Sequence, residues 1–235
     1  MGIVRVLHTS DLHLGLDPLA GTSAEAACST LDKVLRAGAR VHADLLIIAG
    51  DLFDSSRVPD VLVQSVVSSF RSSPLPVVIL PGNHDCLVPE SVYSRHCLPE
   101  LAPNVTVIAD PDGEVVHFAS LDLSLWGKPH TSYADFNPLQ GMPQRGSQKW
   151  QIGIAHGYYV DAEAQSNRGW QITDADICAS NRDYIALGHL EVFNKVGTNG
   201  VQAYYSGSPR IMKAVALVEL DTETGLRVSK LPLES

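Results

Sequence analysis

The chain has 235 residues, of which 45% are hydrophobic and 18% charged, an ordinary composition for a globular protein. Its formal net charge is −9 and it contains only six lysines, which disfavours a broad non-specific surface for nucleic acid. No apolar run approaches the roughly 18 residues of a membrane span. This length favours one α/β domain with a core large enough to need no disulfides.

The N-terminus and the cysteines indicate a cytoplasmic protein. His8, Ser10 and Asp11 interrupt the first apolar segment, so it lacks the long apolar core of a signal peptide. The four cysteines are widely spaced and form no C-x-x-C pair, as expected of reduced, mostly buried thiols. They are Cys28, Cys86, Cys97 and Cys178.

The first third of the chain predicts alternating strands and helices. Short apolar runs at residues 3–7, 45–49 and 76–80 are typical of strands buried on both faces. A helix is expected over about 23–41, where Thr22 and Glu25 have capping-box spacing. A second is expected over about 59–72, with Pro59 in its first turn. This order predicts parallel strands joined by right-handed crossovers.

From about residue 104 the pattern changes to strands separated by turn signals. Asp112-Gly113 and Thr224-Gly225 are interpreted as hairpin turns. The segment 127–149 is rich in Pro, Gly and Gln and shows little periodicity, which is typical of a functional loop. The second half therefore predicts a layer of strands that packs on the first sheet. These strands are expected at 105–109, 115–118, 120–126, 151–155, 184–187, 201–206, 213–220 and 226–230.

Polar side chains follow each of the first three strands. Asp11 and His13 follow the first strand, and Asp51 and Asp54 follow the second. The third strand leads into the run Gly82-Asn83-His84-Asp85. Because the carboxyl ends of parallel strands share one edge of a sheet, these three loops are expected to converge.

Two later apolar strands end in further candidate ligands. His156 follows one of them, and His189 and Glu191 follow the other. Carboxylates mixed with imidazoles suit Mn²⁺, Fe or Zn²⁺ and, less well, Mg²⁺. Seven ligands are too many for one catalytic ion but fit two ions that share a carboxylate, an arrangement that favours displacement at phosphorus. The set is Asp11, His13, Asp51, Asn83, His156, His189 and Glu191.

The ordered motifs D-x-H (11–13), G-D-x-x-D (50–54), G-N-H-D (82–85), H-G (156–157) and G-H-x-x (188–191) resemble those of calcineurin-like metallophosphoesterases. Longer stretches, such as LHTSDLHLG (7–15) and YIALGHL (184–190), resemble DNA-repair exonucleases of the SbcD type. The resemblance runs from residue 4 to about 220. It implies a four-layer α/β/β/α sandwich of two mixed sheets, with a dinuclear metal site at the loop edge.

The resemblance also implies a role for each matching residue. Asp51 would bridge the two ions, His84 would contact the phosphate and protonate the leaving oxygen, and Asp85 would orient the His84 ring. Asp54 would hold a ligand in place. One ion would have the ligands Asp11, His13, Asp51 and Glu191, and the other Asp51, Asn83, His156 and His189.

Two features depart from the family pattern. The family motif ends G-H-x-H, whereas this chain places Glu191 at the last position, which predicts selectivity shifted toward Mn²⁺ or Mg²⁺. The chain also ends at Ser235, so a single domain over residues 1–235 without a C-terminal cap is expected. Arg210 is a candidate contact to substrate phosphate. The long loop 127–149 is a candidate border of the substrate cleft, with the residues Trp126, Lys128, His130, Tyr133, Arg145 and Trp150.

The function expected is that of a metal-dependent phosphodiesterase or nuclease of the DNA-repair exonuclease type. Two alternatives stay open: a partner-binding protein with weakened catalysis, and a small-molecule phosphodiesterase or nucleotidase. Expected partners are a phosphoester substrate such as DNA and, by resemblance, an ATPase subunit, with a homodimer also open. His8 is interpreted as structural, and Trp126, Trp150 and Trp170 as packing residues.

Overall fold

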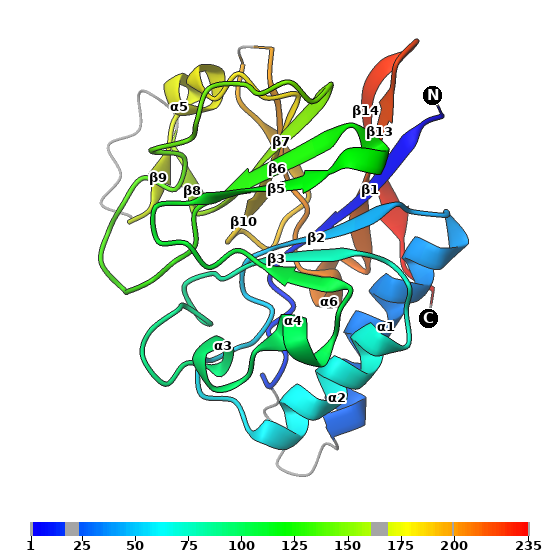
Figure 1. Ribbon diagram of the computed structural model, residues 1–235, viewed down its shortest axis with the longest axis vertical. Helices are drawn as coiled ribbons and strands as arrows, with labels where there is room; N and C mark the ends of the chain where they lie inside the picture. The colour runs from blue at the N-terminus through cyan, green and yellow to red at the C-terminus, as the bar shows by residue number, and fades with distance from the viewer. Residues whose placement is uncertain (1, 17–23, 161–168, 199, 235) are drawn as a thin grey trace.

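The computed structural model describes residues 2–16, 24–160, 169–198 and 200–234, and it consists mainly of two six-stranded sheets packed face to face (Figure 1). The first sheet has the spatial order β14 (Gly225–Pro232), β13 (Ala214–Asp221), β1 (Val4–Thr9), β2 (Leu45–Ala49), β3 (Val77–Leu80), β4 (Val105–Val107). The second has the order β11 (Asn194–Val196), β12 (Gln202–Tyr205), β10 (Tyr184–Gly188), β7 (Trp150–His156), β6 (Leu123–Gly127), β5 (Glu114–Phe118).

Both sheets are mixed. Strands β1 to β4 are parallel, and β13 joins β1 in the antiparallel direction. In the second sheet β12, β10, β7 and β6 are parallel, while β11 and β5 are antiparallel edge strands. The mixed sandwich expected from the sequence is therefore confirmed. A further two-stranded sheet pairs β8 (Tyr158–Tyr159) with β9 (Gln171–Ile172).

Strand alternation divides the apolar side chains between two layers. On β2, Leu45, Ile47 and Ala49 point into the core between the sheets. The intervening Leu46 and Ile48 pack against the helices on the outer face. Burial on both faces explains why β2 is a continuous apolar run rather than an alternating one.

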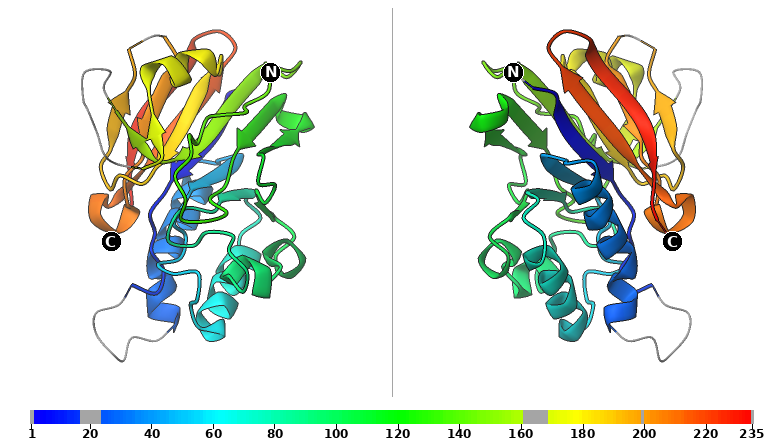
Figure 2. Two further views of the ribbon diagram at one scale, coloured as in Figure 1. Left: turned by 90° about the vertical axis from the view of Figure 1, so that its left-hand side faces the viewer. Right: turned by 90° about the vertical axis from the view of Figure 1, so that its right-hand side faces the viewer.

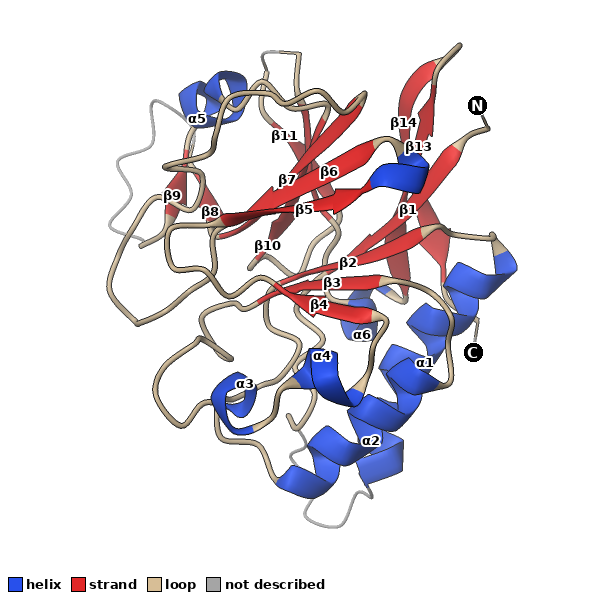
Figure 3. Cartoon of the chain, in the orientation of Figure 1, coloured by secondary structure: helices blue, strands red, loops and turns tan. Residues whose placement is uncertain are grey.

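Helices cover the outer face of the first sheet (Figures 2 and 3). The helix α1 (Ala24–Arg40) and the helix α2 (Asp60–Arg71) contribute Leu31, Val34, Val63 and Phe70 to this layer. The outer face of the second sheet is covered by the short helix α5 (Asp174–Ala179) and by the segment 128–149. Three further short helices are α3 (Val92–Arg95), α4 (Leu98–Leu101) and α6 (Pro209–Met212), and a 3-10 turn spans Ala119–Leu121.

The two expected hairpins have different outcomes. Thr224-Gly225 does join the antiparallel strands β13 and β14. The hairpin expected at Asp112-Gly113 is wrong, because β4 pairs with β3 in the first sheet and β5 pairs with β6 in the second. The backbone N–H of Gly113 donates to the Asp110 carbonyl at 2.9 Å, so this turn carries the chain between sheets.

The capping residue expected at Thr22 lies outside the described residues, and so does the start expected for the first helix at residue 23. Within the described ranges, no helix is both long enough and apolar enough to cross a membrane.

Candidate metal centre

The loops that follow β1 and β2 are hydrogen-bonded to each other. The backbone N–H of Asp11 donates to the Gly50 carbonyl and that of His13 to the Asp51 carbonyl, each at 3.0 Å. Asp11, His13 and Asp51 have positive φ values of 53°, 47° and 54°. Such values are uncommon for residues other than glycine, and they concentrate at functional sites. This paired backbone turns three candidate ligands toward one place.

Asp11, His13 and Asp51 form one group of candidate ligands. Nε2 of His13 lies 4.0 Å from Asp11 Oδ1 and 3.9 Å from Asp51 Oδ2. These separations are too long for hydrogen bonds. Three ligand atoms this far apart leave room for a metal ion between them. Asp11 and Asp51 are each 1% exposed, so water solvates their carboxylates poorly.

Asp51 belongs as well to a second group, with His156 and His189. Nε2 of His156 is 3.2 Å from Asp51 Oδ2, and Nδ1 of His189 is 3.3 Å from the same nitrogen. The side-chain oxygen of Asn83 lies 2.9 Å from both of these ring nitrogens. Ligands around an ion at about 2.1 Å are themselves separated by about 3.0–3.4 Å, so this group also fits a metal.

Two glycines allow the sheets to approach each other at this point. A Cβ on Gly188 would lie 1.8 Å from the Ala49 carbonyl oxygen, and one on Gly50 would lie 1.9 Å from Nδ1 of His156. The same Ala49 carbonyl accepts a hydrogen bond from Nδ1 of His156 at 2.8 Å. This bond directs Nε2 at Asp51, so Nε2 is the nitrogen that would bind a metal ion.

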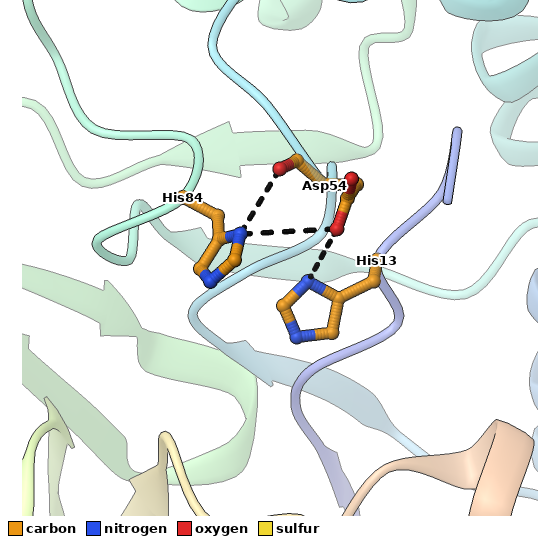
Figure 4. A group of neighbouring side chains, drawn as sticks. All are labelled: His13, Asp54 and His84. Atoms are coloured by element: carbon orange, nitrogen blue, oxygen red, sulfur yellow. Dashed lines mark hydrogen bonds and ion pairs between the residues drawn. The ribbon is translucent and has the colours of Figure 1, made fainter. Parts of the chain in front are cut away.

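A third cluster joins His13, Asp54 and His84 (Figure 4). Oδ1 of Asp54 is 3.3 Å from Nδ1 of His13, which leaves Nε2 of His13 directed at Asp11 and Asp51. Nδ1 of His84 donates to the Asp54 backbone carbonyl at 3.0 Å and lies 3.8 Å from the Asp54 carboxylate. The His84 side chain is 45% exposed, so it stands at the open side of the centre.

The expectation that Asp85 orients the His84 ring is not what the structure shows. The Asp85 carboxylate is buried and accepts hydrogen bonds from Phe53 N at 3.1 Å, Gly82 N at 2.8 Å and the Tyr93 hydroxyl at 2.7 Å. The polar group next to the His84 ring is Asp54. Asp85 instead holds the loops after β2 and β3 against each other and against α3.

Burial and charge perturb the pKa values of the clustered groups. Burial raises the pKa of Asp11 to about 6. Burial also acts to raise the pKa of Asp51, but the neighbouring His156 and His84 hold it below its ordinary value. Burial acts to lower the pKa of His156, yet Asp51 raises it to about 9. A buried cluster of this kind favours a bound cation.

His189 differs from His156. Burial lowers its pKa to about 3, so the ring is neutral and able to act as a ligand. Its backbone N–H donates to the Asp11 carboxylate at 3.1 and 3.2 Å, which joins the end of β10 to the end of β1. His189 also has a positive φ of 95°.

Glu191 and Arg210 are not brought into these clusters. Glu191 is part of none of the three groups found among the described residues. Arg210 belongs to α6, and its Nε is buried without a hydrogen-bond partner in the described part of the chain.

The loop residues expected to border a cleft have different surroundings in the structure. Arg145 is held by Asp183 at 2.8 Å and by the Lys149 carbonyl, and Trp126 is buried in the outer layer of the second sheet. Lys128 lies over the Phe136 ring, with Nζ 5.8 Å from its centroid. Tyr133 is 66% exposed.

Three aromatic side chains contact the candidate ligand histidines, a role that the sequence did not predict for them. His130 is buried, and its Nε2 donates to the His156 carbonyl at 2.8 Å. The rings of Tyr158 and Trp170 lie edge-to-face on His189, with centroids 4.1 and 5.7 Å away. No spacing in the sequence links Trp170 to His189, because the contact arises only when β9 pairs with β8.

Comparison with known proteins identifies the family. The model of the calcineurin-like phosphoesterase family matches residues 4–221, nearly the whole chain. The chain belongs to this family. Its members are hydrolases that act on phosphoester bonds with divalent metals, which agrees with the grouped carboxylates and imidazoles.

Curated relatives agree with this assignment. The chain is 32% identical over 218 residues to a subunit of the nuclease SbcCD from Escherichia coli (strain K12), a match that covers 87% of this chain and 51% of that protein. It is 24% identical over 241 residues to the DNA double-strand break repair protein Mre11 of Saccharolobus solfataricus, covering 91% and 63%. The chain thus spans about half to two thirds of these relatives.

Among solved structures, the protein TT1561 of Thermus thermophilus has the same fold, with a TM-score of 0.64 at 12% identity and coverage of 97% of this chain and 99% of that one.

Proposed function

We propose that this protein hydrolyses phosphodiesters with two divalent metal ions, and that Asp51 bridges them. The observation that carries the proposal is the membership of Asp51 in two adjacent ligand groups, at 3.9 Å from His13 Nε2 on one side and 3.2 Å from His156 Nε2 on the other. Asp11, His13 and Asp51 would hold one ion, and Asp51, Asn83, His156 and His189 the other. Divalent ions supply Lewis acidity, which withdraws charge from a phosphate and favours attack by water.

His84 is the proposed proton donor to the leaving oxygen. Its Nδ1 donates to the Asp54 carbonyl, so Nε2 is the nitrogen available to the substrate. In the imidazolium form Nε2 can donate its proton as the phosphoester bond breaks. We assign Asp85 a positioning role, because its buried carboxylate holds backbone N–H groups of the loops that carry Asp54 and His84.

Glu191 is the proposed fourth ligand of the ion held by Asp11 and His13. Its place outside the observed groups requires a side-chain movement when that ion binds. A carboxylate there favours Mn²⁺ or Mg²⁺ over softer ions. Exchange to histidine, Glu191→His, is expected to raise the preference for Zn²⁺ over Mn²⁺ in competition dialysis with metal analysis. Identical metal preference in both proteins would remove Glu191 from the ligand set.

DNA is the proposed substrate class, and the proposal rests on the relatives. The Escherichia coli relative is named as a nuclease subunit, and the archaeal one as a double-strand break repair protein. By the same resemblance we propose a role in DNA repair and an ATPase partner subunit. A cytoplasmic location is proposed from the four cysteines, which are free thiols in the structure. The net charge of −9 leaves a small phosphodiester as the second candidate.

The first experiment measures metal content and hydrolysis in one preparation. The purified protein is analysed for bound metals and then assayed with Mn²⁺ on bis-p-nitrophenyl phosphate and on single-stranded DNA. His84→Ala is the test variant, and His117→Ala, at an exposed histidine on β5, is the control. We expect about two ions per chain and a loss of hydrolysis only in His84→Ala.

Salt dependence separates the two substrate candidates. Binding to a DNA backbone releases counterions, so the affinity for DNA falls steeply between low and moderate salt. The affinity for a small phosphodiester is expected to change little over the same range. One ion or none per chain, with no turnover at any Mn²⁺ concentration, would reject the enzymatic proposal and leave a partner-binding protein.

A further inference from the structure

The three imidazoles of the proposed metal centre are not oriented in the same way. Nδ1 of His156 donates to the Ala49 carbonyl at 2.8 Å, and Nδ1 of His13 lies 3.3 Å from the Asp54 carboxylate. The Ala49 carbonyl accepts a hydrogen bond from the His156 nitrogen that faces away from the ion, which is the usual way a ligand histidine is held in place. The corresponding nitrogen of His13 makes no hydrogen bond in the described part of the chain, but the Asp54 carboxylate is its close polar neighbour.

His189 lacks such a polar partner. Its Nδ1 faces Asn83 and His156, but its Nε2 is buried without a hydrogen-bond partner among the described residues. An imidazole held at one nitrogen only can turn about its Cβ–Cγ bond, because that torsion is broad. Something other than a hydrogen bond must therefore restrain the ring.

Two aromatic rings occupy the positions that would restrain it. The Tyr158 ring is 4.1 Å from the His189 ring at an interplanar angle of 88°, and the Trp170 ring is 5.7 Å away at 84°. Edge-to-face contacts of this kind stabilise a pair of rings beyond the burial of their surface, so these two contacts favour one orientation of the His189 ring.

Trp170 is itself rigidly held. Its carbonyl accepts from Tyr158 N at 2.9 Å, its indole Nε1 donates to the Ala134 carbonyl at 3.1 Å, and its backbone N–H donates to Asp135. Its φ is +54°, an uncommon value for a bulky residue, and its carbonyl would lie 2.2 Å from a Cβ on Gly157. Such a strained and heavily bonded position is typical of a functional constraint.

We propose that Tyr158 and Trp170 are positioning residues for His189: their rings replace the polar neighbour that the other two ligand imidazoles have, and they set the affinity of the ion held by Asp51, His156 and His189. The inference rests on the proposed dinuclear function. Trp170 also contacts His130, with ring centroids 4.9 Å apart, and His130 holds the His156 carbonyl. Through His130 the segment 128–149 therefore contacts His156 directly and His189 by way of Trp170.

The test is calorimetric titration of the metal-free protein with Mn²⁺ alone. Trp170→Leu and Tyr158→Leu are each expected to lower the affinity for one of the two ions about tenfold and to leave the affinity for the other unchanged. Groups that orient ligand histidines typically contribute about 10–100-fold to metal affinity. Trp170→Phe keeps an aromatic ring and is expected to retain most of the affinity. The matched control is Trp150→Leu, at the opposite end of β7 from His156.

Activity on bis-p-nitrophenyl phosphate provides a second readout. Trp170→Leu is expected to hydrolyse this substrate more slowly than the wild type at limiting Mn²⁺ and at the wild-type rate at saturating Mn²⁺. A global loss of structure would not allow this recovery. Thermal unfolding checks each variant, and Tyr158→Leu together with Trp170→Phe carries the test if Trp170→Leu does not fold. Wild-type affinity for both ions in the leucine variants, or equal weakening in Trp170→Phe and Trp170→Leu, would overturn the inference. Fewer than two ions in the wild type would instead reject the proposed function.

Discussion

At the scale of single residues, the centre depends on groups that bind the ligands rather than the ions. Asp54 is the main example. Its carboxylate lies 3.3 Å from Nδ1 of His13, and its backbone carbonyl accepts from Nδ1 of His84. One residue therefore orients a proposed ligand through its side chain and the proposed proton donor through its backbone. Substitution of the side chain separates these two roles.

Asp54→Asn removes the negative charge beside His13 but keeps the backbone carbonyl that holds His84. We expect the affinity for Mn²⁺ to fall about 10-fold to 100-fold, while the free energy of unfolding changes little. Calorimetric titration and urea denaturation measure the two quantities. Asp112→Asn, at an exposed aspartate in the turn between the sheets, is the control. An unchanged Mn²⁺ affinity in Asp54→Asn would contradict the orienting role.

At the scale of elements, the centre depends on how the strand ends are connected. The Asp85 carboxylate binds the backbone after β2, at Phe53, and the backbone after β3, at Gly82. The Tyr93 hydroxyl brings α3 to the same carboxylate. These bonds hold two ligand-bearing loops and a helix together at a point that is fully buried.

Asp85→Asn replaces an acceptor oxygen with an NH₂ group and leaves buried donors without a partner. We expect the free energy of unfolding to fall by about 2–4 kcal/mol, because an unsatisfied buried donor costs about 1–3 kcal/mol. Tyr93→Phe, which removes one of the three hydrogen bonds, is expected to have a smaller effect. Urea denaturation measures both variants. Wild-type stability combined with loss of turnover in Asp85→Asn would instead support the catalytic role first expected for Asp85.

The approach of β10 to β2 is the second feature at this scale. Gly188→Ala would place a methyl group against the Ala49 carbonyl, which orients His156. We expect a loss of about 1–3 kcal/mol in stability, as for other overpacked sites, together with weaker Mn²⁺ binding. Gly2→Ala, where a Cβ meets nothing within 4 Å, is the control. Thermal unfolding and metal titration test this prediction, which fails if Gly188→Ala behaves like Gly2→Ala.

At the scale of the whole molecule, one buried polar pair joins the two sheets. His8 on β1 points into the core between them, and its Nδ1 lies 2.9 Å from the Tyr184 hydroxyl on β10. Burial lowers the pKa of His8 to about 3, so the ring is neutral in the folded protein. The structural role expected for His8 agrees with this position.

This buried histidine predicts a pH dependence of stability. The unfolded chain protonates His8 below its ordinary value of 6.5, whereas the folded protein does so only near 3. His8 therefore favours folding above pH 6.5, and this contribution is lost as the pH falls from 6.5 toward 3, by up to about 1.4 kcal/mol per pH unit.

The double variant His8→Leu/Tyr184→Phe removes both polar partners together and is expected to show a shallower decline of unfolding free energy between pH 6.5 and 4. Replacing both partners by apolar groups of similar shape leaves no unsatisfied donor. Tyr184→Phe alone keeps the titrating ring and is the control. Chemical denaturation across this pH range measures the slopes, and parallel curves for the wild type and the double variant would refute the assignment.

The local sequence determined the central strands of the first sheet and the loops that carry the candidate ligands. Continuous apolar runs predicted β1, β2 and β3, and the polar residues directly after them predicted which loops carry the ligands. Asp11, His13, Asp51 and Asn83 lie together because parallel strands of the first sheet end at the same edge, and the ends of β7 and β10 in the second sheet bring His156 and His189 to the same place. Strand alternation likewise predicted that His8 points away from the site.

The tertiary structure decided what depends on contacts between distant segments. The sequence could not show that Asp54 rather than Asp85 holds His84, since Asp54 is 30 residues from His84 along the chain and only the folded loops bring the two together. It could not show that Glu191 lies outside the ligand groups. Nor could it place Trp170 against His189, because that contact requires two strands to pair and a tryptophan to adopt a positive φ. Periodicity reports which face of an element is buried, whereas the orientation of a ligand depends on side chains that the fold brings in from elsewhere.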